Sequence, residues 1–415
     1  MWGSDSSVPD PRRRHRTRQS GPVLVIVAPG QGAQTPGFLT PWLEDPTFAA
    51  RFDWLATVAG IDLAHYGTEA DAETIRDTAV AQPLLVASSL LAALSMFPHP
   101  ADAFGRIGAV AGHSVGEIAA ATGAGVITAE QAMVFVRERG RSMAEASAKT
   151  PTGMTAILGG DREEVLAALE REGLTPANDN GTGQIVAAGT MDQLQKLADT
   201  PPEKARLIPL SVAGAFHTEH MQPAVEVLAR LARAMSTHDT RTRLISNRDG
   251  QVIHSGREVL ARLVNQVSSP VRWDLCMQSM ADLGVTGILE MPPAGTLVGI
   301  AKRQLKGVET FALKTPDQLD DARAFVDKHG DASPIDSTPT WRMLVSPSKG
   351  TFRLASDIPL GTQLEPGVLI GEVENLRGKT SVEAPHGGTI VEWIVEDGDL
   401  VSPGQPLVRL HPESE

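Results

Sequence analysis

The chain has 415 residues, which is too long for one hydrophobic core, so we expect two or three domains. Its net charge is −13, and this argues against a protein that binds nucleic acid. A single cysteine, Cys276, excludes internal disulfides and Cys-rich metal sites and suits a cytoplasmic protein.

Residues 1–20 are polar and rich in Pro, Arg and Ser, and we predict a disordered tail. No apolar segment directly follows the basic residues 12–18, so we expect no secretory signal; a nucleic-acid arm is the alternative. The longest apolar run, residues 84–97, contains serines and is too short to span a bilayer. It predicts a buried helix and no membrane partner.

Short apolar runs alternate with helical patterns from residue 23 onward. Residues 23–27 (VLVIV) and 107–112 (IGAVAG) predict buried strands, and PGQGAQ at 29–34 follows the first of them. Residues 83–97 and 118–125 predict helices. This alternation predicts an α/β domain with a parallel sheet and a hydrolase-like core.

Residues 151–212 have a different pattern, namely strand, helix, strand, helix and strand. The segments are GMTAILGG, REEVLAALERE, QIVAAGT, MDQLQKLAD and RLIPLSV. They predict a ferredoxin-like α+β subdomain of the split βαβ type, inserted into the larger α/β domain of residues 21–318.

The C-terminal part is expected to form a separate all-β domain. Residues 319–340 are rich in Asp, Ala, Ser, Pro and Thr and predict a linker. Short strands with regular Gly/Pro turns follow in residues 341–412. SPSKGT at 346–351 is similar to APHGGT at 384–389, and the segments after them are also similar. The repeat predicts a flattened sandwich of two four-strand halves with pseudo-twofold symmetry.

The sequence GHSVGE at 112–117 contains a Gly-x-Ser-x-Gly pattern. Such a pattern arises often by chance in a chain with 39 glycines, so its surroundings must decide its meaning. A predicted strand ends at Gly112, Gly116 permits a tight turn, and a predicted helix follows, whose N-terminus stabilises negative charge. These features predict Ser114 as an exposed nucleophile at a strand-to-helix elbow.

A serine nucleophile also needs a base and an oxyanion hole. His217 in GAFHTEHM (214–221) is preferred as the base over His220. The backbone N–H groups of Val115 and Gln31 are the candidates for the oxyanion hole. The Gly-rich loop that contains Gln31 could instead cradle a phosphate, but it lacks the Lys-Ser/Thr of a P-loop.

These motifs resemble malonyl-CoA:acyl carrier protein transacylases and the acyltransferase domains of polyketide and fatty acid synthases. The resemblance covers roughly residues 22–318, and its specificity comes from the order of the motifs. They are PGQGAQ, AQPLLVAS, GHSVGE, RERGRSM, GQIVAAG, GAFHTEHM, SNRDG, SSPVRW and EMPPAGTLVGIAKR.

The resemblance implies a role for each matching residue. Ser114 is the acyl-accepting nucleophile, His217 its general base, and Gln31 and Val115 the oxyanion hole. Gln266 supplies a backbone carbonyl that orients the histidine. Arg139 binds the free carboxylate of the malonyl group. Gln82, Asn180 and Asn247 line the substrate pocket.

Two of the substrate contacts have a physical argument of their own. Arginine offers a planar, bidentate partner to a buried carboxylate, although Arg139 could also be a surface cation beside Arg137 and Arg141. Phe216, just before the base, resembles the malonyl-selecting type. Its ring leaves little room for an α-methyl group, and excluding one methyl is worth about 1–3 kcal/mol.

The implied reaction is ping-pong transfer of malonyl from malonyl-CoA to the phosphopantetheine thiol of an acyl carrier protein through a malonyl-Ser114 intermediate. It supplies fatty acid or polyketide synthesis in the cytoplasm, and no metal or bound cofactor is expected. The alternatives are a serine hydrolase or thioesterase, since esterases use the same elbow, and a scaffold that links acyl transfer to the carboxylase.

Residues 341–412 resemble a biotinyl/lipoyl carrier domain, most closely over VEAPHGGTIVEWIVEDGDLVSPGQPLVRL (382–410). The modified lysine of such carriers would lie within ENLRG (374–378), but Arg377 holds the matching position. Arginine cannot form the amide and Lys379 lies two residues away, so we expect no biotin or lipoate. An unmodified docking module, linked to the acyl-CoA carboxylase that makes malonyl-CoA, is predicted; an inert appended domain is the alternative.

Overall fold

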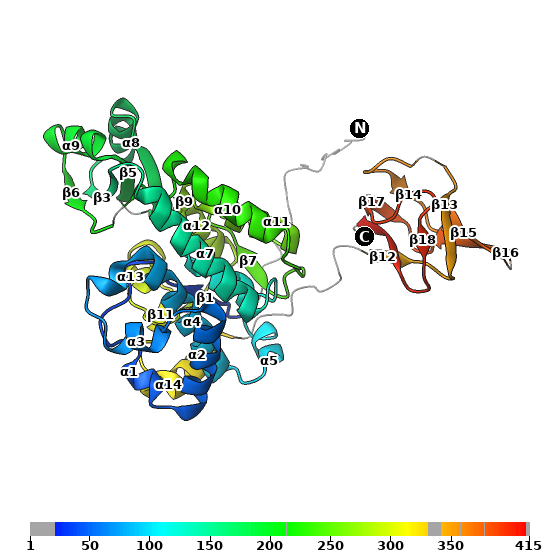
Figure 1. Ribbon diagram of the computed structural model, residues 1–415, viewed down its shortest axis with the longest axis horizontal. Helices are drawn as coiled ribbons and strands as arrows, with labels where there is room; N and C mark the ends of the chain where they lie inside the picture. The colour runs from blue at the N-terminus through cyan, green and yellow to red at the C-terminus, as the bar shows by residue number, and fades with distance from the viewer. Residues whose placement is uncertain are drawn as a thin grey trace, which may run out of the picture. The chain divides into compact units, whose positions relative to one another are not determined.

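The computed structural model describes residues 21–181, 183–212, 214–330, 342–356, 358–376 and 378–411 (Figure 1). The chain divides into two compact units, residues 1–335 and 336–415, and each is considered by itself. The predicted tail at residues 1–20 and the residue at the carrier-lysine position, Arg377, lie outside the described residues.

A six-stranded sheet forms the centre of the first unit, in the order β11-β10-β1-β2-β7-β8. Neighbouring strands pair in parallel except β7 and β8, which are antiparallel. The strands are β1 (Leu24–Ala28), β2 (Ala109–Gly112), β7 (Arg243–Ile245), β8 (Val252–Ile253), β10 (Gly287–Glu290) and β11 (Glu309–Ala312). The predicted α/β class is therefore confirmed, with a mixed sheet.

Both faces of this sheet are buried because its strands are apolar on both sides. Leu24 and Ile26 of β1 belong to one core cluster with α2 (Pro46–Ala59), α4 (Thr78–Met96), α6 (Gly116–Gly123) and α7 (Ala129–Ser147). Val25 and Val27 belong to another with α12 (Trp273–Asp282) and α13 (Thr296–Gln304). The remaining helices of this unit's main part are α1 (Thr40–Leu43), α3 (Leu63–Thr68), η1 (Thr74–Arg76), α5 (Pro100–Phe104), η2 (Glu219–Met221), α10 (Gln222–Ala232), α11 (Gly256–Gln266), η3 (Pro316–Gln318) and α14 (Leu319–His329).

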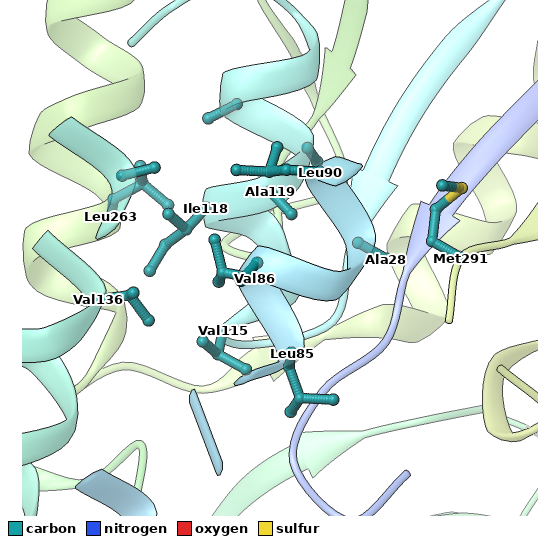
Figure 2. Packing of buried hydrophobic residues seen from close by; sticks show 14 of the residues in the cluster. Ala28, Leu85, Val86, Leu90, Val115, Ile118, Ala119, Val136, Leu263 and Met291 are labelled. Carbon is teal, nitrogen blue, oxygen red and sulfur yellow. The ribbon is translucent and has the colours of Figure 1, made fainter. Parts of the chain in front are cut away.

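The apolar run at residues 84–97 lies in α4 up to Met96, a buried helix as predicted, and the helix begins at Thr78, before the run. The helix has 19 residues, and an 18-residue window in it has a mean hydropathy of 1.7, so by length and composition the helix could cross a membrane although the predicted run alone is too short. Burial identifies it as a core helix, since 72% of its apolar stretch lies inside the fold. Figure 2 shows side chains of α4 beside those at the start of α6, namely Leu85, Val86 and Leu90 with Val115, Ile118 and Ala119.

The predicted α+β subdomain contains more strands than expected. Its sheet has the order β6-β3-β5-β4-β9. The elements are β3 (Thr152–Gly159), α8 (Arg162–Arg171), β4 (Thr175–Asp179), β5 (Gln184–Thr190), α9 (Met191–Asp199), β6 (Ala205–Pro209) and β9 (Val271–Arg272). β4 was missed because its sequence, TPAND, has a proline and no apolar alternation. Pro176 is tolerated where the pairing register shifts.

The predicted linker at residues 319–340 is wrong in its first half, because α14 occupies Leu319–His329. The acidic composition of this segment suggested a linker. Ala322 and Val326, however, lie on one side of the helix and pack into the main core. Both residues are buried. A short amphipathic helix with charged outer positions has the same composition as a polar linker, and only the spacing of its apolar residues distinguishes them.

All regular elements in the described part of the second unit are strands. They are β12 (Arg342–Val345), β13 (Gly350–Leu354), β14 (Gln363–Leu364), β15 (Val368–Asn375), β16 (Gly378–Ala384), β17 (Gly388–Trp393), β18 (Leu400–Val401) and β19 (Pro406–His411). They form two four-stranded sheets, β12-β19-β17-β14 and β16-β15-β13-β18, over one apolar core. If β12, β13, β14 and β15 are replaced in turn by β16, β17, β18 and β19, and the reverse, the order of the first sheet becomes that of the second. This is the pseudo-twofold symmetry that the sequence repeat predicts.

Candidate active site

Ser114 lies between β2 and α6, at the carboxyl edge of the central sheet. Its φ angle is +52°, a left-handed conformation that costs a non-glycine residue about 1–2 kcal/mol. Asn247, after β7, holds this conformation. Its side-chain oxygen accepts from the Ser114 N–H at 2.8 Å, and its side-chain nitrogen donates to the Gly112 carbonyl at 2.7 Å. The elbow is thus fixed by a neighbouring strand.

The two glycines of the motif are required by close packing. A Cβ atom at Gly116 would lie 2.3 Å from the Ala28 carbonyl oxygen, and one at Gly112 would lie 2.0 Å from the backbone of Gly116. Both distances are shorter than any van der Waals contact, and the neighbours are backbone atoms that cannot move aside. The Gly-x-Ser-x-Gly pattern is therefore a packing requirement where α6 starts against β1 and β2.

Ser114 and His217 form a hydrogen-bonded pair. Ser114 Oγ lies 2.8 Å from His217 Nε2, and His217 Nδ1 lies 2.8 Å from the Gln266 backbone carbonyl. Because a carbonyl only accepts, Nδ1 carries the proton and Nε2 is free to accept from the hydroxyl. Burial, reinforced by the charge of Arg139, lowers the pKa of His217 to about 3. The imidazole is thus a neutral base at physiological pH.

The two predicted oxyanion donors lie in loops that follow adjacent strands. β1 and β2 pair in parallel, with Ala28 opposite Gly112, so the loop that carries Gln31 starts beside the loop that carries Ser114. A Cβ atom at Gly30 would lie only 2.9 Å from the His113 carbonyl oxygen, which shows how closely the two loops pack. Within the described residues, neither the Gln31 nor the Val115 N–H donates a hydrogen bond.

Arg139 is buried in α7, with 1% of its surface exposed, so the alternative of a surface cation was wrong. Its Nη1 donates to Gln82 Oε1 at 2.6 Å, and its Nη2 lies 2.9 Å from Gln266 Oε1 and 3.3 Å from Ser114 Oγ. Among the residues described, no carboxylate lies within ion-pair distance of Arg139, and its Nε has no hydrogen-bond partner. Burial lowers its pKa to about 9, so the guanidinium stays charged at pH 7.

The side chain of Gln266 connects these groups, which the sequence did not predict. Its Oε1 accepts from Arg139, and its Nε2 donates to the Ser114 carbonyl at 3.1 Å, to Asn247 Oδ1 at 3.3 Å and to the Glu117 carboxylate. Glu117 is 3% exposed and also accepts from the Asn247 N–H at 2.9 Å. Burial raises the pKa of Glu117 to about 7, against the effect of these hydrogen bonds.

Glu117 was overlooked although it belongs to the quoted GHSVGE motif. An acidic residue in the first turn of a helix normally lies at the surface and interacts favourably with the helix dipole. The sequence alone suggests the same role for Glu117. The only signal against this reading is the purely apolar run IAAA that follows it, because a helix apolar on all sides is buried.

The remaining predicted residues lie around this network. Asn180 Oδ1 is 2.9 Å from His113 Nε2, and Phe216 is buried beside His217. Asn247 is completely buried, and its amide is already engaged by the elbow and by Gln266. These contacts show that Asn247 holds the elbow, and its lining of the substrate pocket stays a prediction. In the described residues, no group of His, Cys, Asp and Glu is arranged to hold a metal ion.

Comparison with known proteins gives consistent matches over the first unit. The family model described as "Acyl transferase domain" matches residues 25–328. The malonyl CoA-acyl carrier protein transacylase of Mycobacterium tuberculosis is 51% identical over 299 residues, which cover 72% of this chain and 99% of that protein. The Bacillus subtilis protein of the same name is 32% identical and covers 72% of this chain and 95% of its own length.

Solved structures match the same region. The crystal structure of MCAT from Mycobacterium tuberculosis has a TM-score of 0.70 at 50% identity and covers 72% of this chain and 99% of its own. A malonyl-transacylase solved in complex with its type II polyketide synthase acyl-carrier protein has a TM-score of 0.67 at 28% identity, covering 73% and 99%. The family match ends at residue 328, before the second unit begins.

Proposed function

The chain belongs to the acyl transferase domain family, and from this we propose that it moves a malonyl group from malonyl-CoA to the phosphopantetheine thiol of an acyl carrier protein. It is an acyltransferase enzyme of fatty acid or polyketide synthesis. The observation that carries the proposal is the buried Arg139 beside Ser114, because a malonyl group keeps a negative carboxylate after its other end has become an ester. Arg139 is a buried cation whose Nη2 lies 3.3 Å from the nucleophile and whose Nε has no hydrogen-bond partner among the described residues, which suits that product.

The reaction takes place in two halves. Ser114 Oγ attacks the thioester carbon of malonyl-CoA while His217 Nε2 takes the hydroxyl proton. The tetrahedral oxyanion is held by the N–H groups of Gln31 and Val115. When the C–S bond breaks, His217 returns the proton to the CoA thiolate and malonyl-Ser114 remains. The carrier thiol then attacks this ester, His217 takes the thiol proton, and the proton passes to Ser114 as the new thioester forms.

We propose positioning roles for several residues, each supported by a contact in the site. The Gln266 carbonyl keeps the proton on Nδ1 of His217 and so keeps Nε2 basic. Gln82 and the Gln266 amide oxygen hold the guanidinium of Arg139 from two sides. Asn180 supports the elbow through His113. The buried, free thiol of Cys276, whose pKa burial raises well above its usual value, suits a reducing cytoplasm.

Transfer is tested by mixing the protein with malonyl-CoA and a phosphopantetheinylated carrier protein and measuring the intact mass of the carrier. We expect one malonyl group per carrier, formed at a rate proportional to enzyme. Release of CoA and free malonate without carrier labelling would instead identify a hydrolase. Carrier protein lacking its phosphopantetheine is the control and should gain no mass.

Phe216 is proposed to select malonyl over methylmalonyl. Its ring is buried next to the base, so an α-methyl group would have to displace it, at a cost of about 1–3 kcal/mol. We expect kcat/KM for malonyl-CoA to exceed that for methylmalonyl-CoA by roughly 10–150-fold, and the F216A variant to reduce this ratio. Competition between the two substrates, read out on the carrier, measures it. Equal values in the unmodified enzyme would contradict the assignment.

The finer fold assignments are also proposals. We propose that the central sheet is a hydrolase-like core with a ferredoxin-like subdomain, which the parallel β1 and β2 and the β3–α8–β4–β5–α9–β6 order support. We propose that the second unit is a biotinyl/lipoyl-like sandwich, supported by its two symmetric four-stranded sheets.

We propose that this second unit carries no biotin or lipoate and is a docking module, with acyl-CoA carboxylase components as its partner. Lys379 lies in β16 opposite Glu374, past the turn of the hairpin, and its amine is 2.6 Å from Glu374 and 3.1 Å from Glu372. These carboxylates raise the pKa of Lys379 and disfavour the neutral amine needed for acylation. Intact mass after coexpression with biotin and lipoate ligases should be unchanged; a gain on Lys379 would refute the proposal.

A further inference from the structure

The carboxylate of Glu117 lies at the end of a hydrogen-bonded chain that starts at Arg139. Arg139 Nη2 donates to Gln266 Oε1 at 2.9 Å, and Nε2 of the same amide donates to the Glu117 carboxylate. A primary amide can hydrogen-bond a cation and an anion at once only if its oxygen accepts from the cation and its nitrogen donates to the anion. The Gln266 side chain therefore joins a buried cation to a buried anion that do not touch.

Among the described residues, Glu117 makes no ion pair, and Arg262 is the cation whose charge acts on it most. Arg262 of α11 acts on it through space but is engaged by Asp249 at 2.7 Å and Glu258 at 2.8 Å. Its remaining polar neighbours are the Asn247 N–H and Ser246, which are neutral. From α12, the Cys276 thiol faces it and is protonated, because burial and the Glu117 charge raise the pKa of the thiol. The charge of Glu117 raises the pKa of Arg139 against the larger effect of burial, so Glu117 partly offsets this buried cation.

A cleft reaches Glu117. It has a volume of about 360 Å³ and is lined by Glu117, Ser246, Arg248, Arg262, Asn265, Gln266, Ser269 and Pro270. Ser114, Arg139 and His217 are absent from this lining. Gln266 separates the cleft from the catalytic groups, so a proton can reach Glu117 without passing through the acyl site.

On the basis of the proposed function, we propose that Glu117 is the internal counter-charge of Arg139 and takes up a proton from solvent when the malonyl carboxylate binds Arg139. The incoming carboxylate neutralises the guanidinium, which leaves a second negative charge buried behind Gln266 without compensation. Protonation of Glu117 removes that charge. One proton moves from water to a Glu117 oxygen, and no other bond changes.

The direction of the pH dependence follows from linkage. Burial places the pKa of Glu117 at about 7 in the free enzyme, and malonyl binding raises it further. Protonated Glu117 therefore favours malonyl binding, so affinity for malonyl-CoA rises as pH falls toward 7 and levels off below 7, where Glu117 is protonated in both states. Proton uptake on binding is largest midway between the pKa values of Glu117 in the free and bound enzyme, at a pH above 7, and vanishes well above and well below that pH. At pH 7 it amounts to at most about half a proton per site.

Calorimetry on the Ser114→Ala protein tests this, because that variant binds malonyl-CoA without acylation. The heat of binding is measured at pH 7 in buffers of different ionisation enthalpy, and the slope gives the protons taken up. We expect uptake with malonyl-CoA and none with acetyl-CoA, which has the same CoA moiety but no free carboxylate. The S114A/E117Q double variant should bind malonyl-CoA with no uptake, since glutamine keeps the acceptor for Gln266 but does not titrate.

The outcomes separate the inference from the proposed function. If malonyl-CoA does not bind the S114A protein, the proposed function fails and the inference fails with it. The role of Glu117 is overturned, and the proposed function is not, by any of three results. They are binding of malonyl-CoA without proton uptake, equal uptake when acetyl-CoA binds, and equal uptake in the double variant. Uptake confined to acid pH would assign the proton to His217, whose pKa is about 3. If the double variant does not fold, the acetyl-CoA comparison and the pH at which uptake is largest decide the question.

Discussion

Replacement of Ser114 by alanine should lower kcat/KM for malonyl transfer by about 10⁵-fold or more, the loss expected when a nucleophile that acts with its base is removed. Ser114 Oγ is the atom that His217 Nε2 contacts at 2.8 Å, and alanine leaves no atom to accept the acyl group. Rapid mixing with malonyl-CoA, acid quenching and intact-mass measurement should show a malonyl-enzyme for the unmodified protein and none for S114A.

The control for this experiment is Ser95→Ala. Ser95 lies in α4 and its hydroxyl donates to the Leu91 carbonyl of the same helix at 3.0 Å, so its loss should leave both labelling and transfer unchanged. S114A should remain folded, because its backbone is held by Asn247 and Gln266 through atoms that the substitution keeps. A malonyl-enzyme of normal yield in S114A would assign the nucleophile to another residue.

Arg139→Gln should separate malonyl recognition from catalysis. Removal of one partner of a buried charge pair costs about 2–5 kcal/mol, so kcat/KM for malonyl-CoA should fall by roughly 30- to 5,000-fold. Glutamine can still hydrogen-bond Gln82 and Gln266, so the site should persist. Acetyl-CoA, which has no free carboxylate, should lose less than about tenfold, and the ratio of the two kcat/KM values is the measurement.

Arg141→Gln is the matched control for this variant. Arg141 lies on the same helix, is 58% exposed, and reaches Glu138 only at 3.8 Å, a surface pair worth little. Its replacement should leave both substrates unaffected. If R139Q reduced activity with malonyl-CoA and acetyl-CoA equally, Arg139 would organise the site rather than bind the substrate carboxylate.

Local features of this protein were predictable because short-range chemistry determines them. The apolar runs that became β1 and β2, and the apolar stretch of α4, are buried on every side and need no distant partner to be identified. The elbow was also predictable, since Gly112 and Gly116 exclude any side chain at a fixed spacing around Ser114. The failures, β4 and α14, are segments whose polar composition hides a buried face.

The ordered motifs were sufficient to predict the family and to name Ser114, His217 and Arg139. Their type and their position in a motif suggested the proposed roles, and the fold brings them together: Ser114 Oγ lies 2.8 Å from His217 Nε2 and 3.3 Å from Arg139 Nη2. The Gln266 carbonyl was predicted as the group that orients the histidine, and it lies 2.8 Å from His217 Nδ1.

Only the tertiary structure decided how the buried polar groups pair. Gln266 reaches Ser114 across 152 residues and Glu117 across 149, and Asn247 reaches the elbow across 133. Buried polar atoms must find hydrogen-bond partners, but the sequence does not say which of the many possible partners each one meets. That choice depends on how β2, β7, α6, α7 and α11 come together, and it is what connects Arg139 to Glu117 and gives this site its internal counter-charge.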